Sequence, residues 1–339
     1  MQLSAHGDIS SSASHGVIPG LNLIGDQLRR VKELINEQLI ASEKAGDINH
    51  LLENVHGHGG KMIRPGLVLL AGRCFGKITD EHIRVAAVVE MVHNATLLHD
   101  DVIDEGRIRR GKPTVNSLWG NEIAVLLGDF LLSGVFKTCA ELQPRVIKII
   151  ADTAVRLCEG ELRQSFHREN RRLSESEYIE IITEKSAALF SSCCYLGALL
   201  AKAGEKQTRA LSEFGLNTGI AFQIVDDLLD ITGDEHKTGK TLGSDVTKQK
   251  LTLAVIHLLG TIRDKDKAAL INTYFRRRDP RYDKDSLTVI LNRYGSLKYA
   301  RNRAQEYVTK AVQSLAVLKE SQAKDALIEA AKFMAARTS

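Results

Sequence analysis

The distribution of proline constrains this fold more than any other feature of the sequence. Five prolines occur in the 339 residues, and none lies between Arg145 and Asp279. Proline removes a backbone hydrogen-bond donor and breaks the interior of a helix, so chains built from short elements use it often. Few segments show the strict alternation of apolar and polar residues that indicates a half-buried strand. The sequence therefore predicts an all-α protein.

Apolar residues recur at three- and four-residue spacing along most of the chain, which is the period of an amphipathic helix. This spacing predicts helices over roughly 22–43, 61–75, 81–104, 118–140, 145–167, 175–202, 207–232, 249–263, 286–292 and 296–318. Ser174 and Glu177 form a capping-box pattern where one of them begins. Residues 1–16, rich in Ser, Gly, Ala and His, predict a flexible tail. No linker divides the remainder, so we expect one domain over residues 17–339.

Charge and cysteine usage exclude several classes of protein. The net charge of +4 is small for this length, and no recognised nucleic-acid-binding module is present, so we expect no nucleic-acid partner. The five cysteines form no CxxC pair, and the adjacent Cys193 and Cys194 are poorly placed for a mutual disulfide. No apolar run reaches transmembrane length, and the N-terminus lacks a signal-peptide pattern. We expect a cytoplasmic protein with reduced thiols and no transmembrane segment.

Two strongly apolar helical segments end in the same acidic pattern, DDxxD. The first carries Asp100, Asp101 and Asp104, and the second carries Asp226, Asp227 and Asp230. Positions i and i+4 of a helix share a face about 5.4 Å apart, so such carboxylates repel unless a cation bridges them. Hard oxygen ligands suit Mg²⁺. One such triplet is typical of an exposed helix end, but two of them predict a cavity mouth that holds a magnesium–diphosphate cluster.

Basic residues accompany both acidic patterns. They are Lys61 and Arg64 in HGHGGKMIRP, Arg109 and Arg110 after the first triplet, and Lys240 after the second. A diphosphate needs several cations for neutralisation, and arginine can bind it through two N–H groups at once. Gly59 and Gly60 allow the backbone to approach closely. Each cation alone would be an ordinary surface charge, but their combination with the aspartates predicts a site for two diphosphates.

At these residues the chain closely resembles the all-trans polyprenyl diphosphate synthases. The motifs GGKMIRP, LLHDDVIDEGRIRRGKPTVN and AFQIVDDLLDITGD stand in that family's order and spacing, and the resemblance covers roughly residues 24–335. It is closest to the octaprenyl and solanesyl type. The resemblance implies an all-α, single-domain isoprenoid synthase bundle of long helices around a central cavity, usually as a homodimer.

The resemblance also implies roles for residues at matching positions. Three Mg²⁺ ions on the allylic diphosphate would be held by Asp100, Asp101, Asp104, Asp226, Asp227 and Asp230. The same diphosphate would be contacted by Arg109, Lys185 and Lys240, with Gln223 nearby. The diphosphate of isopentenyl diphosphate would be bound by Lys61, Arg64, His93 and Arg110. The residues expected to act in catalysis are Asp100, Asp101, Asp104, Arg109, Lys185, Asp226 and Lys240.

Two positions depart from the family pattern. Ser186 stands where the family often has threonine, and its hydroxyl keeps the same donor in the substrate site. KQKLTL over Lys248–Leu253 replaces the usual GKPTLP. Lys250 keeps the charge, but the glycine and proline are gone. This second departure concerns the shape of the loop over the site and leaves the chemistry as expected.

The implied reaction is elongation of an allylic diphosphate, with farnesyl diphosphate as the expected primer, by isopentenyl units. Metal and basic side chains stabilise the leaving diphosphate, and that diphosphate serves as the base that removes the final proton. Family enzymes with short products tend to carry an aromatic residue five positions before the first aspartate. Here Ala95 and Thr96 are small. We therefore predict a medium or long product, octaprenyl diphosphate, with geranylgeranyl or farnesyl diphosphate as the alternatives.

Three other classes of protein share parts of this pattern. A class I terpene cyclase would usually replace the second DDxxD with an Asn/Ser/Glu metal motif and has no isopentenyl site. A head-to-head synthase would show differently spaced DxxxD motifs. A non-catalytic subunit of a heteromeric synthase tends to lose the aspartates, and all six are present here. The sequence favours the elongating enzyme, and activity that requires a second polypeptide would favour the subunit.

Overall fold

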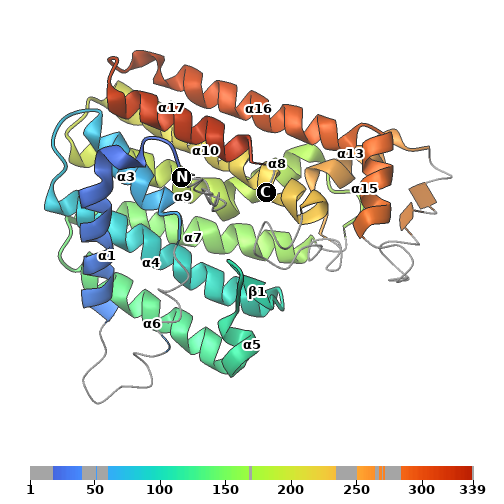
Figure 1. The fold of residues 1–339 in the computed structure, drawn as a ribbon, viewed down its shortest axis with the longest axis horizontal. Helices are drawn as coiled ribbons and strands as arrows, with labels where there is room; N and C mark the ends of the chain where they lie inside the picture. The colour runs from blue at the N-terminus through green and yellow to red at the C-terminus, as the bar shows by residue number, and fades with distance from the viewer. Residues whose placement is uncertain are drawn as a thin grey trace, which may run out of the picture.

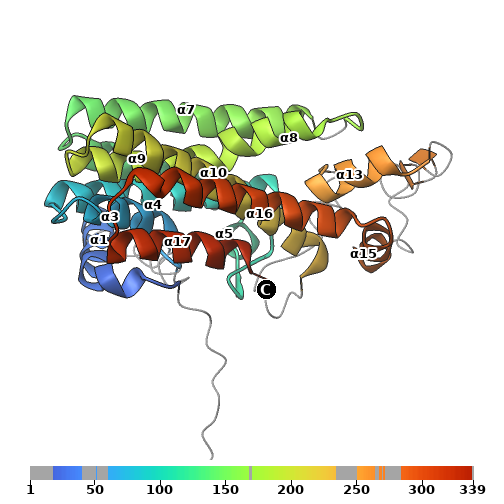
Figure 2. The ribbon, with the colours of Figure 1, turned by 90° about the horizontal axis from the view of Figure 1, so that it is seen from above.

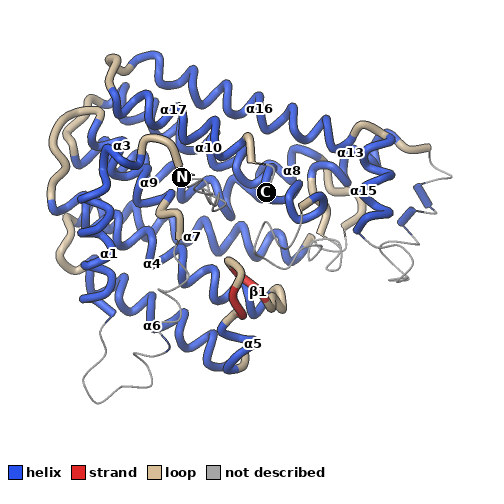
Figure 3. Tube along the Cα trace, viewed as in Figure 1, coloured by secondary structure: helices blue, strands red, loops and turns tan. Residues whose placement is uncertain are grey.

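The computed structural model describes residues 18–39, 51, 60–167, 170–233, 250–263, 267–268, 270–271 and 284–337. Nearly all secondary structure in these ranges is helical, so the prediction of an all-α fold is confirmed (Figures 1 and 3). The predicted tail over residues 1–16 lies outside the described residues. The domain boundary at residue 17 therefore stays a prediction.

The helices follow the predicted ranges with small differences at their ends. In the first half of the chain they are α1 Gly25–Leu39, α3 Ile63–Arg73, α4 Asp80–Ile103, α5 Val115–Trp119, α6 Asn121–Cys139 and α7 Pro144–Phe166. In the second half they are α8 Glu175–Ile182, α9 Ala188–Leu200, α10 Glu205–Thr232, α13 Leu253–Thr261, α15 Lys284–Arg293, α16 Ser296–Ser314 and α17 Gln322–Ala335. A short antiparallel hairpin joins β1 Ile108–Arg109 to β2 Lys112–Pro113.

Helices α4, α9 and α10 form the interior of the bundle. The longest of them, α10, packs against both α9 and α16, while α4 packs against α3, α6 and α9. Helix α7 covers α9, and α17 lies over α3, α10 and α16 (Figure 2). The prediction that the segment before the first aspartates is buried is confirmed, since the side chains of Val85–Val88 are fully buried. Burial of two apolar helices fixes where their polar ends must lie.

Two features of the helical pattern were not predicted from the sequence. The predicted helix over 175–202 is divided by a π-helical turn at Thr183–Ala187. Such turns insert a residue into the helical repeat, which apolar periodicity does not reveal. The other feature is α17, the last helix, whose Ser321 side chain caps it by accepting a hydrogen bond from the Lys324 backbone. The predicted capping box at Ser174 is present.

No helix in the described part of the chain combines the length and the apolar character needed to cross a bilayer.

Close contact between α9 and α10 depends on glycine. A Cβ atom added at Gly215 would lie 2.4 Å from the Phe190 carbonyl oxygen, and one at Gly219 would lie 2.6 Å from the Ala187 Cα. Both neighbours belong to the backbone, so a larger side chain would force the helices apart. Helix packing at this point therefore requires residues without a side chain.

We expect Gly215→Ala to lower the free energy of unfolding by about 1–3 kcal/mol, because the methyl group overpacks this crossing. The measurement is urea unfolding followed by circular dichroism. Gly260→Ala is the matched control, since a Cβ at this helical position meets nothing within 4 Å. It should be neutral or raise stability by up to ~1 kcal/mol. Equal effects of the two changes would contradict the packing argument.

Candidate active site

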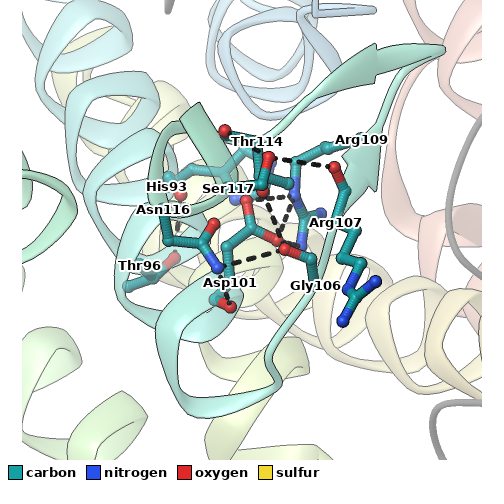
Figure 4. Close-up of polar contacts among 9 residues, drawn as sticks. All are labelled: His93, Thr96, Asp101, Gly106, Arg107, Arg109, Thr114, Asn116 and Ser117. Atoms are coloured by element: carbon teal, nitrogen blue, oxygen red, sulfur yellow. Dashed lines mark hydrogen bonds and ion pairs between the residues drawn. The ribbon is translucent and has the colours of Figure 1, made fainter. Parts of the chain in front are cut away.

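The first aspartate triplet closes helix α4. Asp100 and Asp101 lie in its last turn, and Asp104 is its C-cap residue. The Asp101 side chain is buried and binds Arg109, whose Nε lies 2.9 Å from both carboxylate oxygens and whose Nη2 donates to Oδ1 at 2.6 Å (Figure 4). A carboxylate buried this deeply requires such a partner, because an unpaired buried charge is strongly unfavourable.

The hairpin after α4 delivers Arg109 to this carboxylate. Its turn places Arg110 and Gly111 at φ 53° and 75°, the left-handed region that glycine adopts easily. The Asn116 amide then donates to the carbonyls of Asp101 and Gly106, both at 3.1 Å (Figure 4). The Thr114 hydroxyl also donates to Gly106, at 2.7 Å. These bonds fold the chain back over the end of α4 and explain why the motif continues to Asn116.

The second triplet lies in the last two turns of α10, where Asp227 and Asp230 are buried. The Asp227 carboxylate accepts hydrogen bonds from Tyr178 Oη at 2.7 Å, Gln223 Nε2 at 2.8 Å and Lys250 Nζ at 3.2 Å. Lys250 belongs to the KQKLTL segment, which differs from the family pattern but keeps this positive charge. Its side chain binds Asp227 of the second aspartate triplet. Tyr178 was not predicted as a site residue, since only the tertiary fold brings α8 beside α10.

The two triplets approach each other around Arg109. Burial alone would lower the pKa of Arg109, but the hydrogen bond and charge of Asp101, and then the charges of Asp100 and Asp226, raise the pKa above its usual value. One guanidinium is therefore stabilised by carboxylates of both α4 and α10. The charges of both aspartate motifs therefore act on the same arginine, while their joint role in binding a ligand stays a prediction.

A third helix contributes Glu161, which sequence reasoning missed. Lys185, in the π-helical turn, forms an ion pair with Glu161 and donates to Gln164 Oε1 at 2.7 Å. Helix α7 approaches this turn closely, because a Cβ at Gly160 would lie only 2.3 Å from the Lys185 backbone nitrogen. No apolar or charge pattern in the sequence connects positions 161 and 185.

Asp100 lies beside this third helix. Burial raises the pKa of Asp100 to about 6, while the charge of Lys185 opposes the rise and the charge of Glu161 adds to it. The carboxylate of Asp100 therefore faces a neighbouring acid as well as a base. A site that gathers acids in this way favours the binding of cations.

Ser186 and Gln223 connect the π-helical turn to the second triplet. The Ser186 hydroxyl donates to Gln223 Oε1 at 2.7 Å, and the same amide donates through Nε2 to Asp227. This chain orients the Gln223 amide, so that its oxygen faces Ser186 and its nitrogen faces the carboxylate. The serine hydroxyl makes the contact that a threonine hydroxyl could also make.

The predicted isopentenyl residues form a second group where α3 begins. Arg64 lies with its guanidinium carbon 4.9 Å from the centre of the Phe190 ring. A Cβ at Gly60 would lie 3.1 Å from both Arg110 Nη1 and Glu90 Oε1, so Gly60 lies directly against these two side chains. Glu90 is buried on α4 and was not predicted from the sequence.

Charges of this second group act on His93. Burial lowers the pKa of His93 well below its usual value, and the charges of Arg64, Arg110 and Arg109 lower it further. The imidazole is therefore neutral near pH 7 and can both donate and accept a hydrogen bond. Lys240, the remaining predicted contact, lies outside the described residues.

An apolar cavity lies below the acidic site, between α4, α7 and α9. Its lining includes Val88, Val92, Ile150, Leu157, Leu189 and Leu196. Val92, Thr96 and Asp100 are four residues apart on one face of α4, and Asp100 lies about 12 Å above Val92 along the helix axis. Ala95 is fully buried beside this face, and the Thr96 hydroxyl donates to the His93 carbonyl at 2.8 Å. The cavity therefore lies about 12 Å from Asp100 along α4, on the face that carries Thr96 and Asp100.

The chemistry of the donor set fits a divalent metal. The available ligands are the carboxylate oxygens of the two aspartate motifs at the ends of α4 and α10, which suit hard cations better than soft ones. Among the described residues, no three His, Cys, Asp or Glu side chains already form a cluster that could hold an ion. Arg109 and Lys250 instead neutralise Asp101 and Asp227. A divalent cation held by these carboxylates would therefore compete with Arg109 and Lys250 for Asp101 and Asp227.

Comparison with known proteins decides the family. Residues 46–291 match the family model described as Polyprenyl synthetase. The chain belongs to this family. A short chain isoprenyl diphosphate synthase of Methanothermobacter thermautotrophicus is 35% identical, over 92% of this chain and 98% of that protein. The octaprenyl diphosphate synthase of Escherichia coli is 34% identical, over 90% and 94%.

Two further relatives bear on ligands and assembly. A polyprenyl synthase of Caulobacter crescentus, solved with calcium and isoprenyl diphosphate, has a TM-score of 0.91 at 31% identity and covers 97% of this chain and 100% of its own. Component 2 of the Bacillus subtilis heptaprenyl diphosphate synthase is 34% identical, over 85% of this chain and 81% of that protein. The predicted family, helical fold and prenyltransferase class are thus confirmed. These names differ in chain length, so octaprenyl specificity stays a prediction.

Proposed function

We propose that this enzyme condenses isopentenyl diphosphate with an allylic diphosphate, farnesyl diphosphate being the expected primer, to give a medium or long all-trans polyprenyl diphosphate. Octaprenyl diphosphate is the product that we expect. The observation that carries the proposal is the Arg109 guanidinium, which binds Asp101 of the first aspartate motif and is stabilised by the charge of Asp226 of the second. The cations around Arg64 lie next to this site and provide for a second diphosphate.

The allylic diphosphate would lie between the two aspartate triplets. We propose that Mg²⁺, three ions per site, is held there by Asp100, Asp101, Asp104, Asp226, Asp227 and Asp230. When bound, the ions supply positive charge that stabilises the departing diphosphate. Arg109 and Lys185, which bind Asp101 and Glu161, can donate hydrogen bonds to phosphate oxygens once the substrate competes with those carboxylates for them. Lys240 is proposed as a further contact of the same diphosphate, on the basis of the sequence resemblance alone.

Isopentenyl diphosphate would bind beside it through Lys61, Arg64 and Arg110. Neutral His93 offers a hydrogen bond without adding a charge to the reacting double bond. The two diphosphates held side by side place the double bond near the allylic carbon, and this proximity supplies much of the rate. The proton lost after bond formation passes to the departing diphosphate, so no side-chain base is required.

The growing chain would enter the apolar cavity below Asp100. Its walls come from three helices, each with a charged site residue above it: Asp100 on α4, Glu161 on α7 and Lys185 before α9. An apolar lining favours a hydrocarbon and excludes the water that would quench an allylic cation. Small Ala95 and Thr96 leave the upper part of this path free of bulky groups.

Asp226→Asn should reduce kcat for chain elongation roughly 100- to 1,000-fold, because the loss of one metal ligand removes several kcal/mol of charge stabilisation. Turnover is measured with farnesyl diphosphate, labelled isopentenyl diphosphate and Mg²⁺, and EDTA should abolish it. Asp152→Asn is the matched control, since Asp152 forms an exposed ion pair with Lys148. Activity that survives the Asp226 change unaltered would refute the proposed metal role.

Ala95→Tyr should shorten the product, because a tyrosine at this buried position would extend toward the cavity from its α4 wall. Products of the same incubation are sized by chromatography. Ala95→Ser, which keeps the side chain small, should leave the length unchanged. A wild-type product pool that ends at geranylgeranyl diphosphate would refute the octaprenyl assignment, and unaltered products from a folded Ala95→Tyr protein would refute the role of this position.

We further propose that the enzyme is a homodimer. Apolar residues of α7 recur on one exposed face at Val155, Leu162 and Phe166, which are 57%, 58% and 83% exposed. Helix α6 exposes Leu126 and Phe136 in the same way. Apolar surface of this extent is typical of a protein–protein interface. The Bacillus subtilis relative is named as a component, so a second, different polypeptide is the alternative partner.

Val155→Lys with Phe136→Lys should convert the dimer to monomers, because charges would replace apolar side chains in the interface. Sedimentation velocity measures the mass of each form. Val289→Lys is the control, since Val289 is also exposed, at 67%, but lies on α15. A monomeric wild-type chain that gains turnover only when a second polypeptide is added would favour the heteromeric alternative.

The expected location stays a proposal. All five cysteines are free of disulfides, and Cys193 and Cys194 are buried. Free thiols of this kind suit a reducing compartment, and we propose the cytoplasm.

A further inference from the structure

Two segments of the chain bind Asp227 of the second aspartate motif from outside its own helix. Helix α8 carries Tyr178, whose hydroxyl donates to Asp227 at 2.7 Å. The segment before α13 carries Lys250, whose Nζ donates to the same carboxylate at 3.2 Å. Helix α13 packs on both α8 and α16 (Figure 1). The position of the Asp227 carboxylate therefore depends on how α8 and α13 are fixed to the rest of the bundle.

Tyr299 of α16 binds the start of α8. Its hydroxyl donates to Oε2 of Glu175, the first residue of α8, at 2.6 Å. Arg303, four residues further along α16, donates through Nε to the other oxygen of Glu175 at 2.8 Å. Glu175 precedes Tyr178 by three residues, which is about 4.5 Å along the helix axis. A bond to Glu175 therefore constrains the turn of α8 that carries Tyr178.

The ring of the same tyrosine contacts α13. The rings of Tyr299 and His257 are stacked, with centres 4.1 Å apart and planes inclined by 21°. His257 Nδ1 also lies 3.0 Å from the hydroxyl of Ser296, a fully buried residue that begins α16. Lys250 lies three residues before α13 begins, and the two residues between them are buried. The placement of α13 on α16 therefore constrains Lys250.

We propose that Tyr299 is a positioning residue for the second aspartate motif. Its hydroxyl fixes α8 and its ring fixes α13, so that the donors Tyr178 and Lys250 reach Asp227 together. The inference rests on the proposed function, because it affects activity only if Asp227 takes part in binding the allylic diphosphate with its metal ions. A purely structural role is the alternative, in which Tyr299 stabilises the packing of the three helices without a selective effect on one substrate.

The first test compares KM for both substrates in Tyr299→Phe, which removes the hydroxyl and keeps the ring. Arg303 still binds Glu175 in this variant, so the loss is that of one ordinary hydrogen bond. We expect KM for the allylic diphosphate to rise about 3- to 10-fold, with KM for isopentenyl diphosphate unchanged and the unfolding midpoint only slightly lower. Tyr299→Leu, which removes the stacked ring as well, should raise KM for the allylic diphosphate further.

Tyr195→Phe is the matched control. The Tyr195 hydroxyl accepts a hydrogen bond from Arg145 at 3.4 Å, between α9 and α7. The change removes the same chemical group from a partly buried tyrosine that contacts neither α8 nor α13 through this hydroxyl. It should leave KM for both substrates unchanged.

A double-mutant cycle with Tyr178→Phe tests how the effect reaches the site. If the Tyr299 hydroxyl acts through Tyr178, then adding Tyr299→Phe to Tyr178→Phe should change KM for the allylic diphosphate by less than about 2-fold. Full additivity of the two changes would overturn the proposal, because it would mean that Tyr299 acts independently of the contact between Tyr178 and Asp227.

The outcomes separate this inference from the proposed function. A wild-type protein that forms no prenyl product at all would refute the function itself. A wild-type protein that elongates prenyl chains, with Tyr299→Phe leaving KM for the allylic diphosphate unchanged, would refute only the role of Tyr299. An unfolding midpoint that falls in Tyr299→Phe together with equal changes in both KM values would support the structural alternative and overturn the proposal.

Discussion

Burial of negative charge at the ends of two apolar helices is the constraint on which the rest of the site depends. Asp101 and Asp227 are almost inaccessible to solvent, at 5% and 2% exposed. Neither carboxylate is tolerable there without positively charged or hydrogen-bonding partners. The hairpin that carries Arg109 and the segment that carries Lys250 provide those partners. The buried carboxylates of Asp101 and Asp227 therefore help to fix the positions of the two segments that carry Arg109 and Lys250.

Close helix packing converts this constraint into a defined geometry. Gly160 allows α7 to approach the π-helical turn, and Gly215 allows α9 to approach α10. The first contact aligns Glu161 with Lys185, and the second keeps Ser186 within hydrogen-bond distance of Gln223. Larger residues at either glycine would displace the polar side chains as well as the helices. Glycine at these two positions is therefore needed both for the packing of the helices and for the placement of the polar side chains beside them.

Local sequence predicted the parts of this protein that depend on spacing along a single helix. The aspartates of each DDxxD pattern were predicted to lie together because positions i and i+4 of a helix share a face. The capping box at Ser174 was predictable because it needs only two residues of one turn. Glu90 and Glu161 were missed because their partners are distant in the chain and no periodic pattern connects them. The π-helical turn was missed for a related reason, since close approach of a neighbouring helix leaves no mark on apolar periodicity.

The two proposed diphosphate sites differ in the sign of their fixed charge. In the proposed allylic site, three described cations already have acidic partners: Arg109 with Asp101, Lys185 with Glu161 and Lys250 with Asp227. Further aspartates make that site acidic, so a diphosphate can enter it only together with divalent cations. In the other site, cations cluster around Glu90 and lie against aromatic rings. That site is basic before any ligand binds, so it can hold a diphosphate without metal. The charge difference thus supports the proposal that the metal-bound substrate takes the acidic site and the metal-free substrate takes the basic one.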